Sequence, residues 1–192
     1  LATPHRAAQT MLNLPELDEE FDQLLTSSLV SIYLGFDLPD ADLPADGTGF
    51  IVSQKSDLLC NACTWTSRKW AHTSRKGNLL VRLFYKSSNP SYAQLKDLTE
   101  TELTEVALSD IQKSLGIDAK PVSVEVTGWK NLMPNYTMQH KTAVSALEDK
   151  MAKLVPNVKL AGASFYGVGI GACIQNGKDL AEEIAESILG GK

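Results

Sequence analysis

The sequence predicts an α+β fold: a mixed, mostly antiparallel sheet with flanking helices, followed by a C-terminal strand, a glycine-rich turn and a helix. Two observations predict it. Four strand-like stretches between residues 28 and 85 are joined by short turns, which favours antiparallel pairing between neighbours. The apolar stretch 158–161 then runs into a turn that holds Gly162, Gly167, Gly169 and Gly171, and an amphipathic helix follows to Leu189.

The elements between these two features follow from local patterns. Strands are expected at 28–36, 47–52, 58–66 and 78–85. Thr99 and Glu102 form a capping box that opens a helix ended by Gly116. Alternating valines predict a strand over 121–128. A loop is expected over 129–136, and apolar residues at helical spacing then predict a helix that stops at Pro156. In the last helix, the buried side is expected to hold Ile174, Gly177, Ala181, Ile184 and Ile188.

Composition and charge exclude several classes of function. The net charge of −5 over 192 residues argues against nucleic acid as the main partner. The longest apolar runs are far shorter than the roughly 18 residues of a transmembrane helix. Three cysteines suit a reducing compartment better than a disulfide framework, so we expect a cytoplasmic protein, with peripheral attachment to a membrane left open.

The first residues look like the middle of a fold. Leu1-Ala2-Thr3-Pro4 reads as the tail of a strand followed by a helix start, and no export leader is recognisable. We therefore expect the chain to be the C-terminal portion of a longer protein.

Motifs of metal and nucleophilic chemistry are weak here. Cys60 and Cys63 form a C-x-x-C that lacks a second pair, so buried structural thiols are expected rather than a metal or redox site. The histidines at 5, 72 and 140 are too scattered to predict a metal site. The sequence contains no nucleophile elbow, P-loop or kinase motif set.

A basic aromatic stretch, 65–72, leaves three interpretations open. It could stack nucleic-acid bases, recognise carboxylates on an aromatic ligand, or be a solvated strand end. The acidic total charge argues against the first interpretation.

The glycine-rich turn carries the strongest chemical signal. The first amide groups of a helix have no partners within it, and the helix dipole places roughly +0.5 charge there. The turn lacks the full dinucleotide fingerprint, but it could aim the helix N-terminus at an electron-rich group. Against the pyrimidine end of a flavin, this charge would favour the anionic reduced ring by about 0.3–2 kcal/mol.

Several stretches together resemble the C-terminal part of the bacterial FAD-dependent protoporphyrinogen or coproporphyrinogen oxidases. They occur in the family's order and cover essentially the whole chain, and they are Gly47-Thr48-Gly49-Phe50, Cys63-Thr64-Trp65-Thr66, Lys69-Trp70-Ala71-His72, Trp129 with Met133-Pro134-Asn135-Tyr136, Gly162-Ala163-Ser164-Phe165, Gly167-Val168-Gly169-Ile170 and Cys173-Ile174.

This resemblance implies part of a two-domain flavoprotein of the monoamine-oxidase type. Residues 1–27 would be a helical entry segment, 28–155 part of the substrate-binding domain, and 156–192 the closing segment of the FAD domain. Trp129 would border the flavin, and Val168, Gly169 and Ile170 would supply backbone contacts to it. The implied reaction oxidises a porphyrinogen to a porphyrin in heme biosynthesis, with FAD and molecular oxygen as acceptors and hydrogen peroxide as by-product.

Two departures and one missing segment distinguish this chain from the family. Tyr166 stands where the family commonly has an acidic residue, and Gly171-Ala172 where it has Pro-Asp. The family's N-terminal G-x-G-x-x-G segment is absent, so this chain alone is expected to bind FAD weakly or not at all and to be inactive. The missing segment would be its partner.

Catalytic residues and substrate choice stay open at this stage. No catalytic residue is assigned, and coproporphyrinogen and protoporphyrinogen are not separated. Arg68, Lys69 and Arg75 are candidate partners for substrate propionates by charge alone. Another flavin amine oxidase or desaturase relative, or a non-catalytic ligand-binding domain, are the alternatives.

Overall fold

The computed structural model describes residues 1–43 and 47–189. The chain folds into two compact units. The first unit joins residues 1–26 to residues 132–192, and the second spans residues 27–131. The boundary expected after residue 155 differs from this division, because the helix before it packs with the N-terminal helices. The last three residues of the predicted 156–192 segment lie outside the described part.

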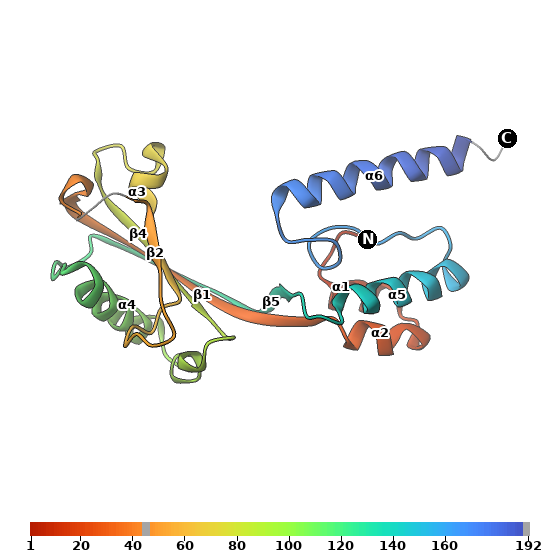
Figure 1. The fold of residues 1–192 in the computed structure, drawn as a ribbon, viewed down its shortest axis with the longest axis horizontal. Helices are drawn as coiled ribbons and strands as arrows, with labels where there is room; N and C mark the ends of the chain where they lie inside the picture. The colour runs from red at the N-terminus through yellow and green to blue at the C-terminus, as the bar shows by residue number, and fades with distance from the viewer. Residues whose placement is uncertain (44–46, 190–192) are drawn as a thin grey trace. The chain divides into compact units, whose positions relative to one another are not determined.

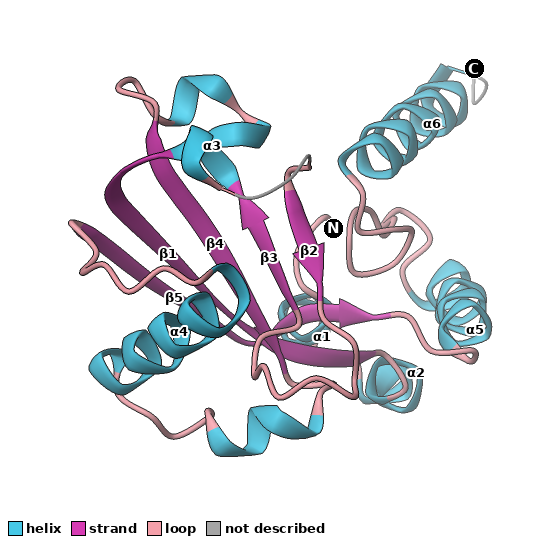
Figure 2. Ribbon diagram, turned by 60° about the vertical axis from the view of Figure 1, so that its left-hand side comes forward, coloured by secondary structure: helices cyan, strands magenta, loops and turns pink. Residues whose placement is uncertain are grey.

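The second unit is built on a five-stranded sheet in the order β2-β3-β4-β1-β5 (Figure 2). The strands are β1 (Leu25–Pro39), β2 (Gly49–Ile51), β3 (Ala62–Trp65), β4 (Asn78–Lys86) and β5 (Ser123–Asn135). The pairs β2/β3, β3/β4 and β1/β4 are antiparallel, which confirms the predicted fold class. β1 pairs with β4 rather than with its neighbour in sequence, so only β2, β3 and β4 form a simple meander.

One face of this sheet is covered by α4 (Glu100–Leu115). The predicted capping box is present: the Thr99 side chain accepts from the Glu102 amide, and the Glu102 carboxylate accepts from the Thr99 amide. Every second residue of a strand points towards α4, because successive side chains in a strand face opposite sides of the sheet. They form the core of this unit with Leu103, Ala107 and Ile111, and in β4 they are Leu79, Val81, Leu83 and Tyr85.

Asp110 of α4 ties the helix to the loop before β3. It is 1% exposed, and its carboxylate accepts from the amides of Leu59, at 3.0 Å, and Cys60, at 2.8 Å. The phenol of Tyr85 donates to the same carboxylate at 3.2 Å. Three donors therefore satisfy this buried carboxylate.

The predicted loop over 129–136 is wrong, because β5 continues through Asn135. Asn131 adopts a left-handed φ of 53° within the strand, and its amide donates to the Ser28 hydroxyl at 2.9 Å. The strand therefore bends without ending, and its last residues belong to the first unit.

The first unit packs three helices around a core of its own. They are α1 (His5–Leu12), α2 (Asp18–Asp22) and α5 (His140–Leu154). The helix expected to stop at Pro156 is confirmed as α5, and it buries Ala143, Val144, Leu147 and Met151 against Leu17 and Phe21. In the described residues, the remaining short elements are α3 (Thr66–Lys69) in the second unit and 3-10 helices at 15–17, 40–42, 71–73 and 90–94.

The end of the chain differs from prediction in two ways. No strand forms over 158–161, because among the described residues only Leu1 pairs with it, through bonds to Lys159 and Ala161. The last helix, α6 (Ile170–Leu189), forms as predicted (Figure 1). Its expected buried side is exposed, with Ile174 at 61% and Ile188 at 69%, because no described element packs over it.

Candidate functional site

The glycine-rich turn leads the chain from 162 into α6 by a tight, bonded path. Gly162 and Gly167 have φ values of 86° and 127°, in the left-handed region that side chains other than glycine rarely adopt. The carbonyl of Gly162 accepts from the amides of Phe165 and Tyr166, both at 3.1 Å. The amide of Gly162 in turn donates to Asn176 of α6 at 3.0 Å, which ties the start of the turn to the helix.

Tyr136 holds the turn from outside. Its phenol accepts from the Gly167 amide at 2.6 Å and donates to the Ala163 carbonyl at 2.7 Å, so one oxygen joins two points of the turn. Burial raises the pKa of this phenol, although the bond from Gly167 acts in the opposite direction. Tyr136 therefore keeps the proton that it donates to Ala163.

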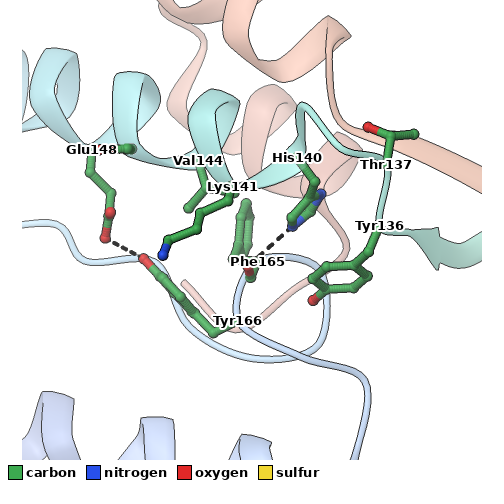
Figure 3. A pocket seen from close by; sticks show the side chains of 9 residues that line it. Tyr136, Thr137, His140, Lys141, Val144, Glu148, Phe165 and Tyr166 are labelled. Atoms are coloured by element: carbon green, nitrogen blue, oxygen red, sulfur yellow. Dashed lines mark hydrogen bonds between the residues drawn. The ribbon is translucent and has the colours of Figure 1, made fainter.

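Two buried histidines support the same turn. His140 is 4% exposed, and its Nε2 lies 3.1 Å from the Phe165 carbonyl (Figure 3). Since a carbonyl can only accept, Nε2 carries the proton in this contact. His5 is 3% exposed, and its backbone amide donates to the Ser164 hydroxyl at 3.2 Å. Burial is the main cause that lowers the pKa of His5, and Arg6 and then His140 lower it further.

A pocket of about 460 Å³ lies between α5 and this turn (Figure 3). Tyr166 closes one side of it and donates to the carboxylate of Glu148. Burial and this bond raise the pKa of Tyr166 far above the ordinary value of a phenol. The pocket is lined by Tyr136, Thr137, His140, Lys141, Val144, Ser145, Glu148, Phe165 and Tyr166.

The turn places the N-terminus of α6 at an open surface. This arrangement is compatible with the flavin that the sequence suggests as a ligand. Val168 is 56% exposed and Ile170 is 81% exposed, and a Cβ added to Gly169 would meet nothing within 4 Å. A Cβ on Gly167 would lie 3.0 Å from that of Ala172, so the chain needs glycine there. Accessible backbone amides at the positive end of a helix dipole can bind an anionic or electron-rich ligand.

The structure separates the predicted site residues between the two units. Val168, Gly169 and Ile170 lie together at the start of α6, whereas Trp129 lies on β5 in the second unit. Arg68 donates to the Asp40 carbonyl at 2.6 Å and lies over Trp65, and Lys69 lies over Trp70. Arg75 is exposed after α3.

Sequence reasoning missed the residues that hold the turn. The sequence places Tyr136 in a predicted loop, and it presents His5 and His140 as isolated residues. Only the fold brings the side chains of Tyr136 and His140 and the backbone amide of His5 to the turn. Arg82 was also missed, because it lies inside a stretch that signals nothing more than a strand. Among the described residues, no three His, Cys, Asp or Glu side chains are grouped to hold a metal ion.

Comparison with known protein families places the chain in one of them. The model of the flavin containing amine oxidoreductases matches residues 1–185, and the chain belongs to this family.

Curated relatives point to one branch of that family. The chain is 33% identical to coproporphyrinogen III oxidase of Bacillus subtilis (strain 168) over 93% of its own length and 37% of the relative's. It is 32% identical to the enzyme of the same name from Staphylococcus aureus, over 96% of its length and 39% of the relative's. The chain therefore spans about two fifths of the length of these relatives.

Solved structures show the same fold. One is a crystal structure from Exiguobacterium sp. 255-15 that is assigned as a protoporphyrinogen oxidase. The match covers 96% of this chain and 40% of the Exiguobacterium chain, with a TM-score of 0.82 and 28% identity. A putrescine oxidase variant matches 96% of this chain and 42% of its own with a TM-score of 0.64, but at 11% identity it shows the fold alone. In the described part of the chain, no helix combines the length and apolar character needed to cross a membrane.

Proposed function

We propose that this chain is the C-terminal part of an FAD-dependent oxidase that converts a porphyrinogen to a porphyrin in heme biosynthesis, with coproporphyrinogen III as the first substrate to test. One observation carries the proposal: the match to coproporphyrinogen III oxidase extends over 93% of the chain at 33% identity. The alternative of another amine oxidase is not favoured, because the putrescine oxidase shares the fold at only 11% identity, whereas the coproporphyrinogen III oxidases share about a third of the residues.

Within such an oxidase, the start of α6 would hold the flavin. The backbone of Val168, Gly169 and Ile170 would contact it, with the positive end of the helix dipole favouring electron density at that point. FAD held there would supply acceptance of a hydride from the substrate, with molecular oxygen as the final electron acceptor. Tyr136 and His140 would keep the turn in place while substrates come and go. Trp129 as a neighbour of the flavin stays a prediction.

The length of the relatives suggests that this chain supplies only part of the cofactor site. It spans about two fifths of their length, and it contains no G-x-G-x-x-G segment to receive the pyrophosphate. We therefore expect residues 1–192 by themselves to bind FAD weakly or not at all and to be inactive.

The test uses the complete protein from which this sequence comes. Purified with its flavin and mixed with coproporphyrinogen III in air, it should form a fluorescent porphyrin and consume oxygen. Protoporphyrinogen IX, assayed in parallel, separates the two substrates. Formation of no porphyrin above the spontaneous rate from either compound would contradict the proposal.

A further inference from the structure

Arg82 lies at the centre of the sheet in the second unit, on the face opposite α4. In β4 its neighbours Val81 and Leu83 point into the core, so the Arg82 side chain must point the other way. Across the strands, Arg82 is paired with Tyr33 of β1 and Thr64 of β3. A cation in this position is unusual, because central strands of a sheet are mostly apolar.

Three aromatic rings surround the Arg82 guanidinium. Its central carbon lies 4.9 Å from the centroid of Tyr33, 4.6 Å from that of Phe84 and 6.0 Å from that of Trp129. A guanidinium over ring faces is stabilised by the ring quadrupole and is held flat against them. The rings therefore stabilise the cation without neutralising its charge.

The hydrogen-bonding capacity of Arg82 is largely unused. Its Nη2 donates to the Ser31 hydroxyl at 3.3 Å, and its Nε is buried without a partner. Within residues 1–43 and 47–189, no carboxylate forms an ion pair with it, whereas Arg6 and Lys150 have such partners in Asp22 and Glu20. A guanidinium has five N–H donors, and leaving one buried and unpaired costs free energy.

We propose that Arg82 binds a carboxylate of the substrate, with Tyr33, Phe84 and Trp129 providing an apolar surface for the ring next to that carboxylate. The identity of the substrate as a porphyrinogen rests on the function proposed above, since its propionate groups are carboxylates on pyrrole rings. A carboxylate fits the planar fork of a guanidinium through two parallel hydrogen bonds.

Binding of the stable product tests this site separately from catalysis. The complete protein is titrated with coproporphyrin III and with its tetramethyl ester, and dissociation constants are measured by fluorescence. Arg82→Gln should weaken binding of the acid by about tenfold to a hundredfold, the usual range for loss of a charge-assisted hydrogen bond. Binding of the ester should be weak and equal in parent and variant. Arg82→Lys should lie between them, because an ammonium keeps the charge but lacks the planar fork.

Lys113→Gln is the matched control, because it removes the same charge from α4, on the other side of the sheet. It should bind coproporphyrin III as the parent does. Circular dichroism of each variant shows whether the fold is kept, and Arg82→Lys answers the question if Arg82→Gln does not fold.

Three results would overturn the assignment: unchanged binding of the acid by both Arg82 variants, equal losses for acid and ester, or no binding of coproporphyrin III by the parent. A different result would overturn only the proposed function. If the parent oxidised neither porphyrinogen while Arg82→Gln still selectively weakened binding of the acid, Arg82 would stand as a carboxylate site.

Discussion

The phenolic oxygen of Tyr136 lies 2.6 Å from the amide nitrogen of Gly167 and accepts its hydrogen bond. The same oxygen donates to Ala163, four residues earlier in the turn. Gly167 has a φ of 127°, a backbone conformation that glycine adopts and other residues rarely do. Tyr136 therefore acts as an external clamp on the segment that delivers the chain to α6.

Removing this clamp should loosen the proposed flavin site. Tyr136→Phe deletes both hydrogen bonds and keeps the ring, and each bond contributes about 0.5–1.5 kcal/mol. We expect the complete protein to bind FAD about tenfold more weakly, as measured by titration of the flavin-free form. Tyr92→Phe, at a phenol with no recorded bond among the described residues, is the control. Equal affinities in the two variants would remove Tyr136 from the support of the site.

Substitution of Gly169 should affect flavin binding without affecting folding. Because a Cβ at this position would meet nothing within 4 Å, Gly169→Val should leave the unfolding temperature of residues 1–192 close to that of the parent. In the complete protein, the same change should lower flavin retention, because the side chain would enter space that the cofactor needs. Gly169→Ala should show a smaller loss. Full flavin retention in Gly169→Val would exclude this part of the turn from the site.

His5 should make the first unit sensitive to acid. Burial lowers the pKa of this histidine, so below its ordinary value near 6.5 the unfolded chain binds a proton that the folded chain does not. The stabilisation is complete above about pH 6.5 and is lost as the pH falls through the lowered folded-state pKa, with a slope of up to about 1.4 kcal/mol per pH unit.

Denaturant unfolding of residues 1–192 at several pH values between about 7 and 5 measures this slope. His5→Gln has no imidazole to protonate, so the free energy of unfolding should depend less on pH in the variant. The same slope in parent and variant would show that His5 does not titrate differently on folding.

Asp110 should be the most sensitive polar residue of the second unit. Asp110→Ala leaves the amides of Leu59 and Cys60 and the phenol of Tyr85 without their acceptor. We expect a loss of about 3 kcal/mol or more in the free energy of unfolding, because each buried unpaired donor costs about 1–3 kcal/mol. Asp97→Ala, at a side chain that is 85% exposed, should change it by less than about 0.5 kcal/mol. Similar losses in both would contradict this role.

The sequence predicted those elements whose signals are local. Thr99 and Glu102 are three residues apart, so the capping box could be recognised and is confirmed. The glycine turn and α6 were likewise found from spacing alone. The extension of β5 was missed because Asn131, Pro134 and Asn135 are turn-forming residues, and their strand is fixed by pairing with the distant β1.

The roles of Tyr136 and Arg82 could not be predicted for the same reason. Tyr136 reaches Gly167 across 31 positions of sequence, and Arg82 meets Ser31 across 51. Neither contact leaves a periodic pattern. The apolar side of α6 was predicted as buried, but burial requires a second surface, and the described residues provide none for it.

Anaerobic reduction of the flavin tests the proposed oxidase function, because this one measurement requires both the cofactor and the substrate. The complete protein, purified with its flavin, is mixed with coproporphyrinogen III in the absence of oxygen, and the flavin absorbance is followed. We expect the yellow absorbance to bleach as porphyrin forms and to return when air is admitted. A protein that carries no flavin, or whose flavin stays oxidised with both coproporphyrinogen III and protoporphyrinogen IX, would contradict it.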